Sequence, residues 1–234
     1  GRVFPSDGQH LAHPFSQAFA FCWSAWLHQL RREPEPAQAL AHAGLEVTTE
    51  QGFALLEMLC AMMESWALTE QDQTEVGLEG ILQKLREFQA TGAQLGQLHF
   101  WVLLAEVYSR TGRFDEGLSL VAQALAELDQ KGEQFYAAEL YRLRGEMLLA
   151  HQTVPDPAAE VEACFLQAVD LACQQDIRAL QLRATTSLAR LQIRQGRAAE
   201  AGAMLSSVYR QFTEGFDTLD LQTAGDLMSS SGLD

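Results

Sequence analysis

The most informative segment of the sequence is Trp101-Val102-Leu103-Leu104-Ala105-Glu106-Val107-Tyr108. Its apolar residues recur at the spacing of a helix with one buried face. The small residue Ala105 lies inside this pattern, where a second helix can approach closely because no long side chain intervenes. Gly112 follows and interrupts the pattern, and a second helical pattern begins beyond it. The segment therefore predicts two helices joined by a short turn.

Small residues recur along the whole chain with a period of 40 to 44 residues. One series, on the first helix of each pair, consists of Ala25, Ser65, Ala105, Gly145 and Ala189. The other, on the second helix, consists of Ala37, Gly77, Gly117, Val161 and Ala201. One small residue on each helix, at the point of closest contact, is what a repeated helical hairpin requires. The longer step after Gly145 coincides with the proline-containing loop 152–157.

We therefore expect an all-α chain of about five helix pairs with a capping helix at its C-terminal end. The first helices are expected over residues 14–31, 53–70, 95–110, 134–150 and 177–194. The second helices are expected over residues 35–50, 74–90, 114–130, 157–174 and 198–212, and the capping helix near 217–229. As one domain over 1–234, this gives a leader at 1–12, repeats at 13–51, 52–91, 92–131, 132–175 and 176–214, and a cap at 215–230.

The third helix pair resembles the tetratricopeptide repeat (TPR), whose first helix follows the pattern W-x-x-L-G-x-x-Y. Trp101, Leu104, Ala105 and Tyr108 stand at these positions. A period near 40 alone would also suit HEAT or armadillo repeats. The resemblance implies a right-handed α-solenoid with helices longer than those of the usual 34-residue repeat.

Two longer segments, 132–149 and 209–221, are similar to the C-terminal tails of large bacterial signalling proteins. In that group a class III nucleotide cyclase domain precedes a P-loop ATPase domain and a TPR tail. A more distant similarity is to the repeat domain of the maltose-responsive transcriptional activator. These resemblances imply a sensor or docking role beside a switch ATPase. The sequence contains neither G-x-x-x-x-G-K-[ST] nor G-x-G-x-x-G, so we expect no enzyme activity in this chain, although its parent can carry such domains.

Composition argues against several classes of function. The net charge of −15 repels phosphate backbones, which disfavours a nucleic-acid partner. No apolar run approaches the roughly 20 residues of a membrane span. The four cysteines form no C-x-x-C pair and have no histidine at metal-ligand spacing, so we expect reduced thiols, a cytoplasmic location, no cofactor and no metal site.

Apolar candidates for partner binding lie on the first helices of the N-terminal half. They are Phe19, Trp26, Leu59, Met62 and Trp66. Such residues often anchor a partner segment in the concave groove of a repeat protein. Two alternatives stay open at this point: the side chains belong to the core, or an upstream repeat covers them.

Charged candidates lie on the equivalent helices of the C-terminal half. They are Glu106, Arg142, Arg183, Arg190 and Arg194. Arginines gathered on one helix face could bind an acidic peptide or a phosphorylated ligand. The alternative is that Arg183 pairs with Glu139 of the preceding repeat, and that Arg190 pairs with Glu146 in the same way. Arg194 has no acidic counterpart one repeat away, which favours it as a cation available to a ligand.

The sequence thus predicts a non-catalytic module that binds a protein, a peptide or neighbouring domains of its own parent chain. The alternative function is a sensor that binds a small metabolite in the concave groove. A homodimer formed through an exposed aromatic end of the solenoid is a further expectation.

Overall fold

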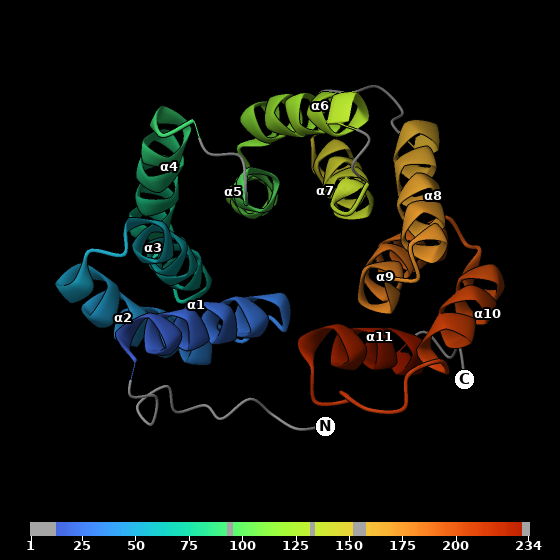
Figure 1. Cartoon of the computed structure of the whole chain (residues 1–234). Helices are drawn as coiled ribbons and strands as arrows, with labels where there is room; N and C mark the ends of the chain where they lie inside the picture. The colour runs from blue at the N-terminus through green and yellow to red at the C-terminus, as the bar shows by residue number, and fades with distance from the viewer. Residues whose placement is uncertain (1–12, 93–95, 132–133, 152–157, 231–234) are drawn as a thin grey trace. The chain divides into compact units, whose positions relative to one another are not determined.

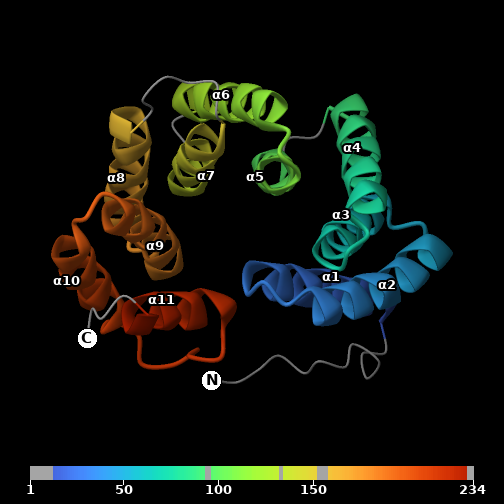
Figure 2. The ribbon, with the colours of Figure 1, turned by 180° about the vertical axis from the view of Figure 1, so that it is seen from behind.

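The computed structural model describes residues 13–92, 96–131, 134–151 and 158–230, and it contains eleven α-helices and no strand within them (Figures 1 and 2). The first helices of the five pairs are α1 (Pro14–Leu30), α3 (Ala54–Glu70), α5 (Gln97–Thr111), α7 (Ala137–Ala150) and α9 (Arg178–Arg194). The second helices are α2 (Pro34–Gln51), α4 (Thr74–Ala90), α6 (Phe114–Lys131), α8 (Ala158–Gln174) and α10 (Ala198–Tyr209), and the cap is α11 (Leu219–Ser230). The helices expected from the sequence are confirmed, each within about three residues at its ends.

The chain forms two compact units, residues 1–100 and residues 101–234. In the first unit, α1 packs against α2 and α3, and α3 packs against α4. In the second unit, α7 packs against α6, α8 and α9, and α9 also contacts α10 and α11. The first helices α1, α3, α7 and α9 therefore each contact the second helix of their own pair and the first helix of a neighbouring pair. The expectation of a single domain over 1–234 stays a prediction.

The small residues lie at the helix crossings, as their period predicts. A Cβ atom added to Gly77 of α4 would lie 2.5 Å from the carbonyl oxygen of Ser65 and 2.8 Å from the amide nitrogen of Thr69, both on α3. A Cβ on Gly145 of α7 would lie 2.5 Å from the ring of Phe165 on α8. Real Cβ contacts are longer, so these two hairpins close only because the positions lack a side chain.

Glycines also end helices where the sequence predicts a turn. Gly52 follows α2 with φ of 71°, and Gly112 follows α5 with φ of 73°. This left-handed backbone conformation suits glycine and stops the helix. The loop 152–157, which the sequence places between two helices, lies outside the described residues.

The core of each unit consists of large apolar side chains at the helix crossings. In the first unit these include Trp66, Met62, Ile81 and Phe88, all 1% exposed or less. The ring of Phe88 meets that of Phe100 edge-on, with centroids 5.3 Å apart. In the second unit, a cluster around Phe165 joins α7, α8 and α9, and a cluster around Leu205 joins α9, α10 and α11.

No helix in the part of the chain that the structure describes is both long and apolar enough to span a lipid bilayer.

Candidate functional site

The candidate residues fall on one recurring surface of the first helices. In α3 it is formed by Leu59, Met62 and Trp66, and we call the equivalent positions of every pair the A-helix face. Forty residues earlier, Phe19, Cys22 and Trp26 hold these positions on α1. The second unit places Glu139, Arg142 and Glu146 there on α7, and Arg183, Thr186 and Arg190 on α9.

In the first unit, the A-helix face of α3 belongs to the core. Leu59, Met62 and Trp66 are 6%, 0% and 1% exposed. Side chains buried to this degree against neighbouring helices cannot contact a partner. The hypothesis that these three residues anchor a partner is therefore corrected, in favour of the core alternative that the sequence left open.

On α1 two of the three positions are more open, whereas Cys22 is fully buried. Phe19 is 47% exposed, whereas Trp26 is half-buried. The indole of Trp26 stacks on the ring of His99, with centroids 4.3 Å apart, and on that of Trp23 at 5.0 Å. His99 is 2% exposed, and its burial disfavours the imidazolium and lowers its pKa from 6.5 to about 3.

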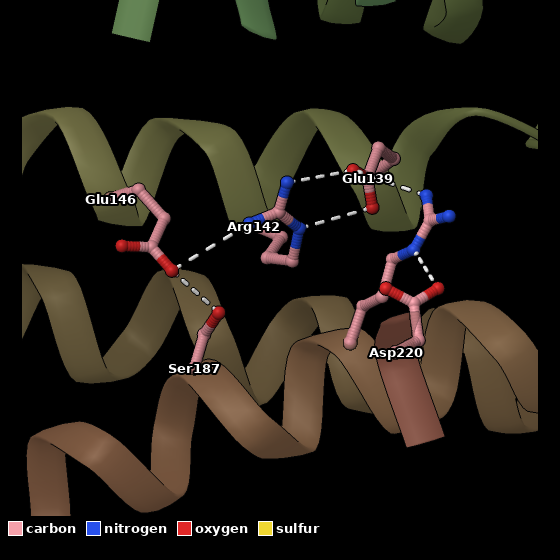
Figure 3. Close-up of polar contacts among 6 residues, drawn as sticks. Glu139, Arg142, Glu146, Ser187 and Asp220 are labelled. Carbon is pink, nitrogen blue, oxygen red and sulfur yellow. Dashed lines mark hydrogen bonds and ion pairs between the residues drawn. The ribbon is translucent and has the colours of Figure 1, made fainter. Parts of the chain in front are cut away.

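In the second unit, the A-helix face carries a network of buried charges (Figure 3). Arg142 Nε donates to Glu139 Oε2 at 3.1 Å, and Arg142 Nη2 donates to Glu139 Oε1 at 2.7 Å. Arg142 Nη1 lies 3.6 Å from Glu146 Oε1. Glu139 and Arg142 are 5% and 9% exposed, so this two-pronged pair is largely shielded from water.

The network extends from α7 to α9 and α11 (Figure 3). Arg183 Nη1 lies 3.7 Å from Glu139 Oε1, and Arg183 Nε donates to Asp220 Oδ2 at 2.6 Å. Ser187 Oγ donates to Glu146 Oε1 at 2.6 Å. The pairing of Arg183 with Glu139 is the one that the repeat register predicts. These contacts join α7, α9 and α11 of the second unit through their polar side chains.

The charges of this network stabilise one another. Burial alone would lower the pKa of Arg142, but the carboxylates of Glu139, Glu146 and Glu106 outweigh it, and the pKa is raised. Arg142 therefore keeps its charge in the buried site. Glu106 of α5 is half-buried and acts on Arg142 through its field. We infer that Arg142 and Arg183, together with their carboxylate partners, have a structural role and hold α7, α9 and α11 in register.

Arg190 and Arg194 lie one turn apart on α9, and both side chains are exposed. Arg194 Nε donates to the backbone oxygen of Arg190 at 3.3 Å, and within the described residues neither guanidinium forms an ion pair. The alternative in which Arg190 pairs with Glu146 is therefore wrong. Glu146 instead contacts Ser187 and Arg142. Two arginines thus remain available to a ligand at the end of α9.

Sequence reasoning missed Asp220 and Ser187. Asp220 lies 37 residues beyond Arg183, roughly one repeat further along the chain. If α11 is treated as the first helix of an incomplete sixth pair, this spacing would have placed a carboxylate beside Arg183. Ser187 gives no such signal, since a serine on a helix more often bonds its own backbone.

Comparisons with known proteins identify solved structures with a similar fold. No model of a known protein family matches the sequence, and no curated protein matches it by sequence. Among solved structures, the chain is similar to NprR in complex with its cognate peptide NprX, with a TM-score of 0.77 and 15% identity. That match covers 96% of this chain and 64% of NprR, so the chain spans less than two thirds of that protein.

Two further structures support the same fold. The apo form of the quorum sensor NprR from B. thuringiensis matches with a TM-score of 0.65 and 16% identity, over 93% of this chain and 60% of that one. A Podosopora anserina protein described as a kinesin light chain with nearly identical TPR-like repeats matches with a TM-score of 0.57 and 17% identity, over 86% and 96%. Together they confirm the expected all-α, TPR-like solenoid, and at these identities they show the fold alone.

Proposed function

We propose that this chain is a regulatory module that docks a peptide, or an extended segment of a partner protein, on the A-helix side of its second unit. The observation that carries the proposal is the match of 96% of the chain to NprR bound to its cognate peptide. A repeat solenoid offers a long surface to an extended segment, which suits this role. The neighbours are a quorum sensor and TPR-like repeat proteins, which supports a non-catalytic function.

The chemistry of the site indicates which segment would bind. Arg190 and Arg194 present two exposed guanidinium groups on a chain of net charge −15. Guanidinium groups form strong two-pronged hydrogen bonds with carboxylates. The network around Arg142 and Glu139 lies on the same side of the helices and is satisfied internally, so it can hold the surface in shape without contacting the ligand. We therefore expect a partner segment that carries acidic side chains or a free C-terminal carboxylate.

As a finer proposal, the module acts on neighbouring domains of a bacterial, cytoplasmic parent protein. This part rests on the similarity of segments 132–149 and 209–221 to the tails of cyclase and ATPase signalling proteins. Binding of the segment would change the activity of such a neighbour only if the module binds the segment more tightly in one of the neighbour's two states than in the other.

A selection from a library of random displayed peptides tests the docking proposal. We expect the wild-type chain to enrich acidic peptides, and Arg190→Ala/Arg194→Ala to lose that enrichment. Arg86→Ala/Arg210→Ala is the matched control, since it also removes two exposed arginines but leaves α9 intact. No enrichment by a folded wild-type chain, or equal enrichment by both double variants, would contradict the proposal.

A small-ligand sensor is the second candidate, and one observation favours it. In the first unit, Gln29 Oε1 and Trp66 Nε1 are buried and make no hydrogen bond within the described residues. Buried polar atoms usually have a partner, and a bound small molecule could supply one. A thermal-shift screen of polar metabolites tests this function: a hit should raise the melting temperature of the wild type but not of Gln29→Leu. Selection of acidic peptides with no metabolite hit would favour the docking function.

A further inference from the structure

Helix α1 exposes a continuous apolar stripe along its length. Its members are Phe15, Phe19, Trp23, Leu27 and Leu30, each between 44% and 51% exposed. Their spacing of four, four, four and three residues places them on one side of the helix. The ring of Phe19 lies 6.3 Å from that of Phe15 and 5.6 Å from that of Trp23, so the aromatic part of the stripe is contiguous.

The same positions receive a neighbouring helix pair elsewhere in the chain. Forty residues beyond the middle of the α1 stripe are Leu59, Met63 and Ala67 of α3, and these are 6%, 0% and 0% exposed. Helix α3 packs against both α1 and α2. On α9 the equivalent Ser187 and Leu191 are 3% and 4% exposed, and α9 packs against α7 and α8. The stripe therefore has the shape of a surface that accepts helices.

We propose that the α1 stripe is the interface of a homodimer, in which α1 packs antiparallel against α1 of a second copy. Charge is the reason for choosing a second copy. Each chain carries a net charge of −15, so most of its surface repels another copy. Residues 14–27 include no charged side chain. This helix is therefore a place where two copies can meet without opposing like charges.

The geometry of the stripe suits a two-fold contact. Trp23 lies at its centre, so an antiparallel pair of helices places Trp23 at the axis, with Phe19 beside Leu27 of the second copy. The five half-exposed side chains offer roughly 400–500 Å² of apolar surface, given the size of aromatic and leucine side chains. A stable interface needs about 800 Å² from each partner. Leu55, 45% exposed, and Phe53, which meets Phe15 edge-on at 5.5 Å, can extend the contact area.

Sedimentation equilibrium tests this interface. We expect the wild type to sediment at twice its subunit mass of 25.9 kDa. Trp23→Glu brings two carboxylates together at the axis and should raise the dimer dissociation constant at least about 100-fold. Val76→Glu is the matched control, because Val76 is also an exposed apolar residue, at 58%, but lies on α4. Added salt should strengthen the dimer, since it screens repulsion between two acidic chains.

Two outcomes overturn the proposal: a wild type that stays monomeric at its highest soluble concentration, and a dimer that Trp23→Glu leaves intact. Circular dichroism establishes that each variant is folded. If Trp23→Glu unfolds, Phe19→Ser/Leu27→Ser replaces it, with the same expected loss of the dimer. The docking site on α9 belongs to the other unit, so loss of the dimer with peptide binding retained would separate this inference from the proposed function.

Discussion

The A-helix faces of the two units pack against neighbouring helices through different kinds of side chain. On α3, Leu59, Met62 and Trp66 are buried; 80 residues later, Glu139, Arg142 and Glu146 hold the same positions on α7. Glu139 and Arg142, at 5% and 9% exposed, are shielded from water nearly as well as Leu59, at 6%. The repeat geometry therefore determines which positions are buried. The residue types at those positions determine whether the helices are joined by apolar packing or by a network of charged side chains.

The apolar face should be the more sensitive to truncation. Trp66→Ala removes a fully buried indole and leaves a cavity in the first unit, so we expect the free energy of unfolding to fall by about 4 kcal/mol. Val76→Ala shortens an exposed side chain on α4 of the same unit, and we expect less than about 1 kcal/mol. Denaturation by urea, followed by circular dichroism, measures both. Equal losses in the two variants would contradict the burial contrast.

The charged face should be sensitive to the removal of one partner. Glu139→Gln keeps the shape of the side chain but leaves Arg142 buried without its principal counter-charge, which should cost about 3 kcal/mol. Glu116→Gln breaks an exposed pair with Arg113 and should leave the unfolding midpoint unchanged. The same urea titration compares the two variants. A Glu139→Gln protein as stable as the wild type would show that the network contributes nothing to the second unit.

His99 should make the first unit sensitive to acid. Its imidazole stays neutral in the folded chain down to about pH 3, whereas in the unfolded chain it takes up a proton near pH 6.5. The contribution of neutral His99 to the free energy of unfolding is therefore fully present above pH 6.5 and is lost as the pH falls toward 3. At pH 5 the loss is about 2 kcal/mol. We expect His99→Gln to reduce the difference in unfolding free energy between pH 7 and pH 5. A His99→Gln protein with the same difference as the wild type would contradict this expectation.

The helices could be predicted from the sequence because their signals are local. The period of small residues located the crossing of Ser65 with Gly77, and Gly112 located the end of α5. Exposure could not be predicted in this way. Phe19 and Leu59 hold equivalent positions, yet one is 47% and the other 6% exposed, because a preceding helix pair covers α3 and none in the described residues covers α1.

The candidate site could be predicted only in part, for a similar reason. The register of the repeats placed Arg183 near Glu139, and the structure confirms this pair at 3.7 Å. It placed Arg190 near Glu146 wrongly: Glu146 Oε1 instead accepts a hydrogen bond from Ser187 Oγ at 2.6 Å and lies 3.6 Å from Arg142 Nη1. The ion pairs and hydrogen bonds between repeats thus depend on which donors along a helix reach a given carboxylate. The repeat spacing alone does not show this.

The exposed arginines of α9 should matter least for folding. Arg190→Ala/Arg194→Ala removes two solvated side chains without ion pairs in the described residues, so we expect a stability change within about 0.5 kcal/mol. Thermal unfolding beside the wild type measures it. A large loss would show that these arginines belong to the structural network.

The affinity of a selected acidic peptide for the same variants tests the docking account most directly. Fluorescence anisotropy with a labelled peptide gives the dissociation constant for the wild type, Arg190→Ala/Arg194→Ala and the control Arg86→Ala/Arg210→Ala. The account predicts that the first variant raises the dissociation constant about 10- to 100-fold, that the control changes it little, and that added salt weakens wild-type binding. Equal affinity for all three proteins would contradict docking at this end of α9.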